Sequence, residues 1–140
     1  MADDTESSIA LGAEDPMAGA YQDLDQLAML PTNWDSYGGG PPSECARAVA
    51  RELLEAVTKR FRGVASDRIE PVTVGGLPGS GVLLEWQDDV ASLEVDIRPD
   101  GVIGYLFVDR RGGERQTVEG DAVSTGMVLD RLATILATRS

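Results

Sequence analysis

Between residues 81 and 109, three stretches of alternating apolar and polar residues follow one another with only short breaks. The stretches are GVLLEWQ, VASLEVDIR and GVIGYLFVD, and alternation with a period of two is typical of a β-strand with one covered face. The breaks fall at Asp88-Asp89 and Pro99-Asp100-Gly101, and the second has the composition of a hairpin turn. Because such short connections join antiparallel neighbours, this region predicts an antiparallel meander.

The middle stretch assigns side chains to the two faces of this sheet. One set is apolar and consists of Ala91, Leu93, Val95 and Ile97. The other set is polar and consists of Ser92, Glu94, Asp96 and Arg98. We therefore expect one face of the sheet to be covered and the other to be in contact with water.

Three segments have apolar residues at helical spacing. They are residues 17–30, residues 44–61, which follow a possible N-cap at Ser43, and residues 122–138, which follow Asp121. Two weaker segments complete the pattern: a first strand at residues 69–74, which contains a proline typical of an edge strand, and a possible last strand at residues 114–118. Residues 75–81, GGLPGSG, are expected to form a turn.

These elements predict the α+β class. We expect a three- to four-stranded antiparallel meander with helices packed on one face, in the order α-α-β-β-β-β-α. Residues 17–140 are expected to form a single domain, and residues 1–16 a disordered acidic N-terminus, because they are small, polar and rich in acids.

Acidic charge is concentrated in the first third of the chain. The sequence has 24 acidic and 12 basic residues, a formal charge of −12, and nine of the acids precede Arg47, where no base occurs. This balance argues against direct nucleic-acid binding, which requires a basic surface. It favours a protein partner with a basic surface, or else a segment whose charge only keeps it in solution.

The composition also excludes several chemistries. Histidine is absent, so the chain has no Ser-His-Asp triad and no histidine metal ligand, and the single cysteine, Cys45, cannot form an intrachain disulfide. We therefore expect no enzymatic activity and no cofactor. Neither a signal peptide nor a membrane span is recognisable in the sequence, which predicts a cytoplasmic protein that does not contact membranes.

Two groups of residues are candidates for a binding site. Glu94 and Asp96 share one face of a strand, and Glu85 lies beside them if the strand register allows it. Such carboxylates could also bind Mg²⁺ or Ca²⁺ in a small hydrolase. The second group is aromatic: if the loop at residues 31–43 folds over a sheet edge, Trp34, Tyr37 and Trp86 form one surface, as aromatic residues often do in interfaces.

The loop NWDSYGGGPPS resembles a Trp-Asp-Gly-Tyr-Gly-Ala-x-Pro-type segment of a group of small bacterial proteins. The matching residues are Trp34, Asp35, Tyr37, Gly38, Pro42 and Ser43. The resemblance extends over about residues 25–107, through Pro71, Val74, Leu84-Glu85-Trp86 and the Asp100-Gly101 turn before Tyr105, and departs from the pattern at Ser36 and Gly39. It implies an accessory or inhibitory partner role and assigns no activity.

Together these observations predict a non-enzymatic protein-binding module, such as an accessory, immunity-like or antitoxin-like subunit. The predicted contact residues are Trp34, Asp35, Tyr37, Gly38, Glu85, Trp86, Glu94 and Asp96. Two alternatives are an acidic inhibitor that mimics nucleic acid and a structural subunit that pairs through the edge strand around Pro71. The oligomeric state is left open by the sequence.

Overall fold

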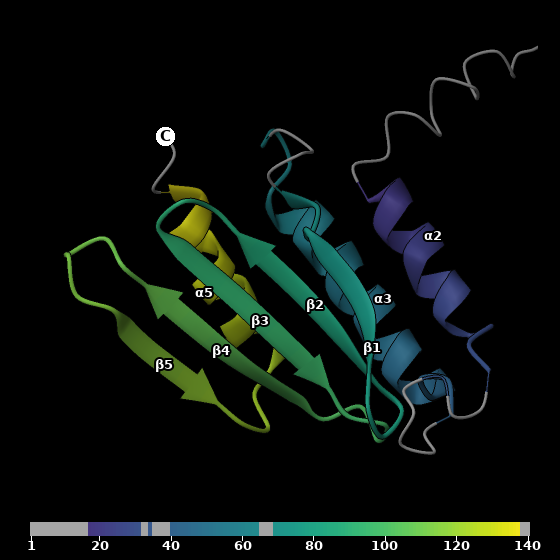
Figure 1. The fold of residues 1–140 in the computed structure, drawn as a ribbon. Helices are drawn as coiled ribbons and strands as arrows, with labels where there is room; N and C mark the ends of the chain where they lie inside the picture. Colours follow the sequence, from purple (N-terminus) through teal and green to yellow (C-terminus); the bar gives the residue numbers. More distant parts are fainter. Residues whose placement is uncertain (1–16, 32–33, 35–39, 65–68, 138–140) are drawn as a thin grey trace, which may run out of the picture.

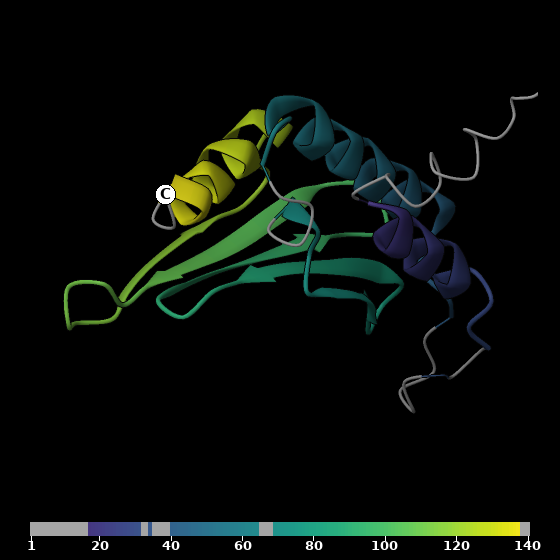
Figure 2. The ribbon, with the colours of Figure 1, turned by 90° about the horizontal axis from the view of Figure 1, so that it is seen from above.

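The structure, a computed structural model, describes residues 17–31, 34, 40–64 and 69–137. These residues form a five-stranded antiparallel sheet and three helices, of which the second and third lie on one face of the sheet and the first lies beside its edge (Figure 1, Figure 2). The element order is α-α-β-β-β-β-β-α, which confirms the α+β class. The expected disorder of residues 1–16 falls outside the described residues.

The sheet is a simple meander whose strands lie side by side in chain order. The strands are β1 (Thr73–Leu77), β2 (Gly81–Gln87), β3 (Ala91–Ile97), β4 (Ile103–Asp109) and β5 (Gln116–Gly120). The turn between β3 and β4 forms as expected, because Gly101 adopts a φ of +89° and its N–H donates to the Arg98 carbonyl over 2.8 Å.

The helices are α2 (Ala18–Leu27), α3 (Glu44–Arg60) and α5 (Thr125–Ala137). Ser43 is the N-cap of α3, as the sequence predicts, because its Oγ accepts the Ala46 N–H over 3.0 Å. The first helix is shorter than expected, since the chain after Leu27 tightens into bonds of three-residue spacing. None of the helices in the described parts of the chain has the length and apolarity that a membrane crossing requires.

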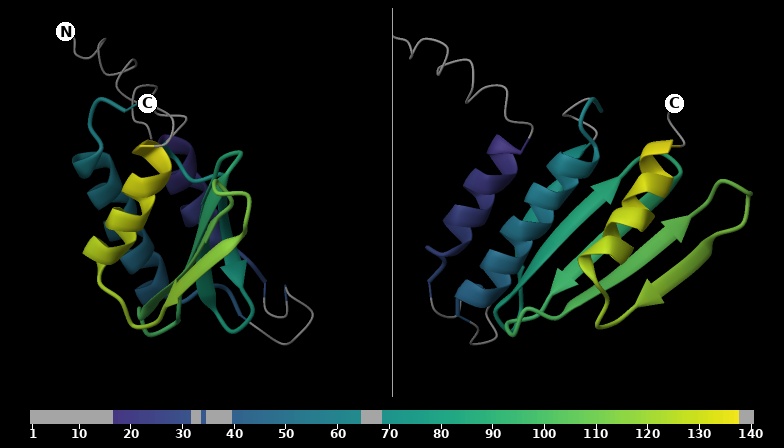
Figure 3. Two further views of the ribbon diagram at one scale, coloured as in Figure 1. Left: turned by 90° about the vertical axis from the view of Figure 1, so that its left-hand side faces the viewer. Right: turned by 180° about the vertical axis from the view of Figure 1, so that it is seen from behind.

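The core lies between the helices and the sheet. The predicted inward set of β3 is buried, with Leu93, Val95 and Ile97 each at 0% exposure, and α3 and α5 contribute the facing apolar side chains. Seen edge-on, α3 and α5 lie on this side, and none of the described helices covers the opposite side of the sheet (Figure 3, left). The expected division into a covered and an open face is therefore present.

The sheet has five strands, so the expected count of three to four is wrong. The first strand runs from Thr73 through Gly75 and Gly76, which the sequence assigned to a turn. Glycine is tolerated at position 76 because the Trp34 ring occupies the place of a side chain there: an added Cβ would lie 2.9 Å from Trp34 Cζ2. The weak C-terminal segment also forms a full strand, β5.

The last helix begins later than the sequence indicates. Ala122 adopts a left-handed φ of +53°, which cannot continue into a helix, and α5 starts at Thr125. Ser124 Oγ accepts the Met127 N–H over 3.2 Å and takes the capping place expected for Asp121. Asp121 instead forms an ion pair with Arg98.

Candidate functional site

The uncovered side of the sheet carries most of the predicted carboxylates. We call it the open face and define it by its solvent-side residues Leu83, Glu85, Glu94, Asp96, Leu106 and Glu119. The strand register aligns them in rows, with Glu85 directly opposite Glu94, Glu94 opposite Leu106, and Leu106 opposite Glu119. The register thus brings Glu85 beside Glu94, the arrangement that the sequence left open.

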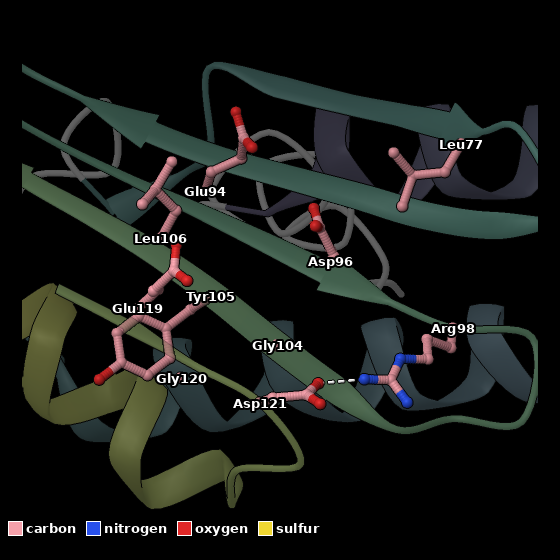
Figure 4. Close-up of a pocket in the computed structure, with 10 residues that line it drawn as sticks. All are labelled: Leu77, Glu94, Asp96, Arg98, Gly104, Tyr105, Leu106, Glu119, Gly120 and Asp121. Carbon is pink, nitrogen blue, oxygen red and sulfur yellow. Dashed lines mark hydrogen bonds and ion pairs between the residues drawn. The ribbon is translucent and has the colours of Figure 1, made fainter. Parts of the chain in front are cut away.

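Asp96 lies in the next row, between Leu83 on β2 and Gly104 on β4. Because Gly104 has no side chain, the surface is hollowed beside the carboxylate. The hollow has a volume of about 590 Å³. It is lined by Leu77, Glu94, Asp96, Arg98, Gly104, Tyr105, Leu106, Glu119, Gly120 and Asp121 (Figure 4).

Two carboxylates of the open face, Glu94 and Asp96, lie in surroundings that disfavour their negative charge. Partial desolvation raises the pKa of Glu94 above its usual value, and the negative charges of Asp96 and Glu85 raise it further. Desolvation also raises the pKa of Asp96, although this residue is still exposed at the surface. Both shifts show that this face disfavours its own negative charge.

A carboxylate at the end of β4 shows what a basic neighbour would do. Asp109 accepts hydrogen bonds from the Arg111 guanidinium and from the Arg111 N–H, and these bonds lower the pKa of Asp109 to about 2. Among the described residues that line the hollow, Arg98 is the only base, and it is already paired with Asp121 (dashed line in Figure 4). Among the described residues lining the hollow, Glu94 and Asp96 therefore have no free arginine that would stabilise their charge as Arg111 stabilises the charge of Asp109.

Trp86 does not belong to this surface, so its predicted role in an exposed aromatic patch is wrong. Its side chain is 2% exposed, and its Nε1 donates to the Ile69 carbonyl over 2.8 Å. The reason is the strand alternation: Glu85 points to the open face, and its neighbour Trp86 must point to the helices. The sequence already indicated this orientation, because Val82, Leu84 and Trp86 are alternate residues of one strand and therefore point to the same face.

Trp34 is half-buried at the edge of the sheet, on the helix side of β1. Its Nε1 donates to the Gly40 carbonyl over 2.7 Å, and its ring covers Gly76. Gly76 lies opposite Val82, a core residue, so Trp34 and the open-face carboxylates lie on different sides of the sheet. The other predicted loop contacts, Asp35, Tyr37 and Gly38, fall outside the described residues.

Glu119 of the open face and Leu77, which lines the hollow, were not recognised from the sequence. Glu119 comes from a strand that the sequence barely indicated, and its place beside Leu106 depends on the β4–β5 register. Leu77 comes from the segment expected to be a turn. Their alternation with neighbouring residues was the only available signal, and it is short in both strands.

Neither a metal centre nor a relative points to a chemistry for this site. In the parts of the chain that the structure describes, no group of three or more His, Cys, Asp or Glu side chains is arranged to hold a metal ion. Comparison of the chain with protein-family models, with curated proteins and with solved structures found no match.

Proposed function

We propose that this protein is a non-enzymatic binding module whose open face docks on a basic surface of another protein. The observation that carries the proposal is the group of neighbouring carboxylates Glu85, Glu94 and Asp96, on a sheet face that none of the described helices covers. Desolvation and the charges of Asp96 and Glu85 raise the pKa of Glu94 in this group. The resembling bacterial proteins suggest an accessory or inhibitory subunit, and a cytoplasmic location accords with the sequence.

The charges support a partner that is basic. Like charges placed directly opposite in an antiparallel pair destabilise a sheet. A lysine or arginine from a partner would replace the repulsion between Glu85 and Glu94 by attraction, as Arg111 does for Asp109. Such complementarity raises association rates and selects among partners.

The apolar neighbours of the carboxylates supply contact area. Leu83 and Leu106 are half-buried on the open face, and Leu77 borders the hollow. Apolar side chains surrounded by charged ones are the usual anatomy of a protein–protein contact. The face therefore combines area that gains from burial with charges that orient the partner.

Binding accords with the sequence better than catalysis does. The chain contains no histidine, and the register places neither lysine nor tyrosine opposite Glu85, Glu94 or Asp96. The nucleic-acid mimic is a special case of the same chemistry, in which the partner is a nucleic-acid-binding protein. Competition by duplex DNA for that partner distinguishes this case.

The test is affinity capture from a lysate of the source organism with three immobilised proteins. They are the wild type, the open-face variant Glu85→Gln/Glu94→Gln, and the control variant Glu52→Gln/Glu55→Gln, which makes the same charge change on the exposed side of α3. We expect one protein to bind the wild type and the control equally, and the open-face variant at least roughly tenfold less. Equal capture by all three, or no capture, contradicts the proposal.

A further inference from the structure

The two edges of the sheet differ in how they are protected. At one edge, α2 packs beside β1, and Trp34 covers Gly76 (Figure 1). At the other edge, β4 is the only described element that β5 contacts extensively. The strand projects beyond α5 (Figure 3, right). Residues 116–119 are all exposed, and Val118, on the helix side, is 38% exposed.

The hydrogen bonds of β4 show which backbone groups of β5 face outward. Arg110 N–H donates to Val90, and Arg98 N–H donates to Val102, so the even-numbered residues of β4 pair with β3. The odd-numbered residues of β4 consequently pair with Gln116, Val118 and Gly120. The N–H and C=O groups of Thr117 and Glu119 therefore point away from the sheet, where another strand could bind them.

Natural sheets usually block such an edge with proline, lysine, a bulge or a covering helix. The sequence of β5, QTVEG, contains neither proline nor lysine, and its register with β4 is continuous, without a bulge. None of the helices that the structure describes has more than slight contact with β5. This edge is thus available for pairing.

The sequence around β5 is complementary to itself. If two copies meet antiparallel with Thr117 opposite Thr117, Arg115 of each copy lies opposite Glu119 of the other. Threonine pairs and pairs of opposite charge are both favourable across antiparallel strands. Neither Arg115 nor Glu119 has an ion-pair partner among the described residues, so both are available for this contact.

We propose that the β5 edge pairs with β5 of a second copy of this chain, with Thr117 at the two-fold axis. The pairing joins two sheets into one and, because the axis is perpendicular to the sheet, places both open faces on the same side. On the helix side, Val118 of each copy lies opposite Gln116 of the other copy, and the two Val118 side chains are diagonal neighbours. This proposal does not depend on what the open face binds.

The test is the molar mass in solution, measured by light scattering and sedimentation equilibrium over a concentration series. We expect the wild type to dimerise and Thr117→Pro to remain monomeric, because proline removes an outward N–H and no bond to β4. Thr117→Ala, which keeps that N–H, should still dimerise. Circular dichroism confirms that the variants are folded.

A charge exchange tests the register and does not require the proline variant to fold. Arg115→Glu alone is expected to weaken dimerisation roughly tenfold, because it creates two repulsive pairs per dimer. Adding Glu119→Arg should restore the wild-type dissociation constant. A wild type that is monomeric throughout, a Thr117→Pro dimer, or a failure of the exchange to restore binding would overturn the proposal.

Discussion

The two faces of the sheet are built from the same strands, because successive residues of a strand point alternately to one face and to the other. On the helix side, Leu93, Val95 and Ile97 are completely buried, whereas on the open side desolvation and the charges of Asp96 and Glu85 raise the pKa of Glu94. The helix side stabilises the fold by burying apolar side chains, whereas the open side disfavours the negative charge of Glu94 and Asp96. The difference teaches that alternation along one strand separates residues that hold the fold together from residues that are free to contact a partner.

The largest expected effect comes from comparing adjacent residues of β2. Trp86→Ala removes a buried aromatic side chain and should lower the free energy of unfolding by about 3–5 kcal/mol. Glu85→Ala, one position away on the open face, should change it by less than about 1 kcal/mol. Urea denaturation monitored by circular dichroism measures both variants, and equal losses would show that the faces are not divided in this way.

A second comparison uses the paired glycines of β1. Gly76→Ala places a Cβ 2.9 Å from the Trp34 ring and should destabilise the protein by about 1–3 kcal/mol. Gly75→Ala, on the open face, meets no atom within 4 Å and should be neutral or stabilising.

The cause of the Gly76→Ala effect can be checked with a double variant. In a Trp34→Ala background, the same substitution should lose most of its cost, because the clash is gone. An undiminished cost in this background would show that Trp34 does not pack on Gly76.

How far the sequence reveals this structure depends on how local each feature is. The α3 N-cap at Ser43, the Gly101 turn and the alternation of β3 rest on neighbouring residues, and all three are as predicted. The sequence predicts a turn at the two glycines of β1, because Trp34, whose ring packs on Gly76 in the strand, is distant in sequence. The start of α5 depends on the backbone of Ala122, a residue that ordinarily favours helix.

The same distinction applies to the site. Glu94 and Asp96 could be assigned to one face because they lie two residues apart in one strand. Their companions Glu85 and Glu119 depend on the pairing of β2 with β3 and of β4 with β5, which hairpin lengths constrain only loosely when the strand ends are uncertain.

A smaller effect is expected from neutralising the open face. Glu94→Gln should raise the free energy of unfolding at neutral pH by about 0.5 kcal/mol, because it removes repulsion from Glu85 and Asp96. Glu55→Gln on the exposed side of α3 is the matched control and should bring no gain. A loss of stability in Glu94→Gln would contradict the repulsion on this face.

The smallest effect is the pH dependence of that gain. The pKa of Glu94 is raised in the folded protein, so folding favours the protonated form, and the charge of Glu94 costs stability only as pH rises through this pKa. The gain from Glu94→Gln should therefore be full at neutral pH and disappear as pH falls below the ordinary value of 4.5. Denaturation curves of both proteins across this range test the sign, and a gain that grows on acidification would reverse it.

The most direct test of the central claim is to label carboxylates with a carbodiimide in the free protein and in its complex with the captured partner. Mass spectrometry then gives the extent of labelling at each position. We expect the partner to protect Glu85, Glu94 and Asp96 and to leave Glu52 and Glu55 on α3 labelled as in the free protein. Unchanged labelling on the open face, with protection on the helix side, would contradict the claim that the open face is the binding surface.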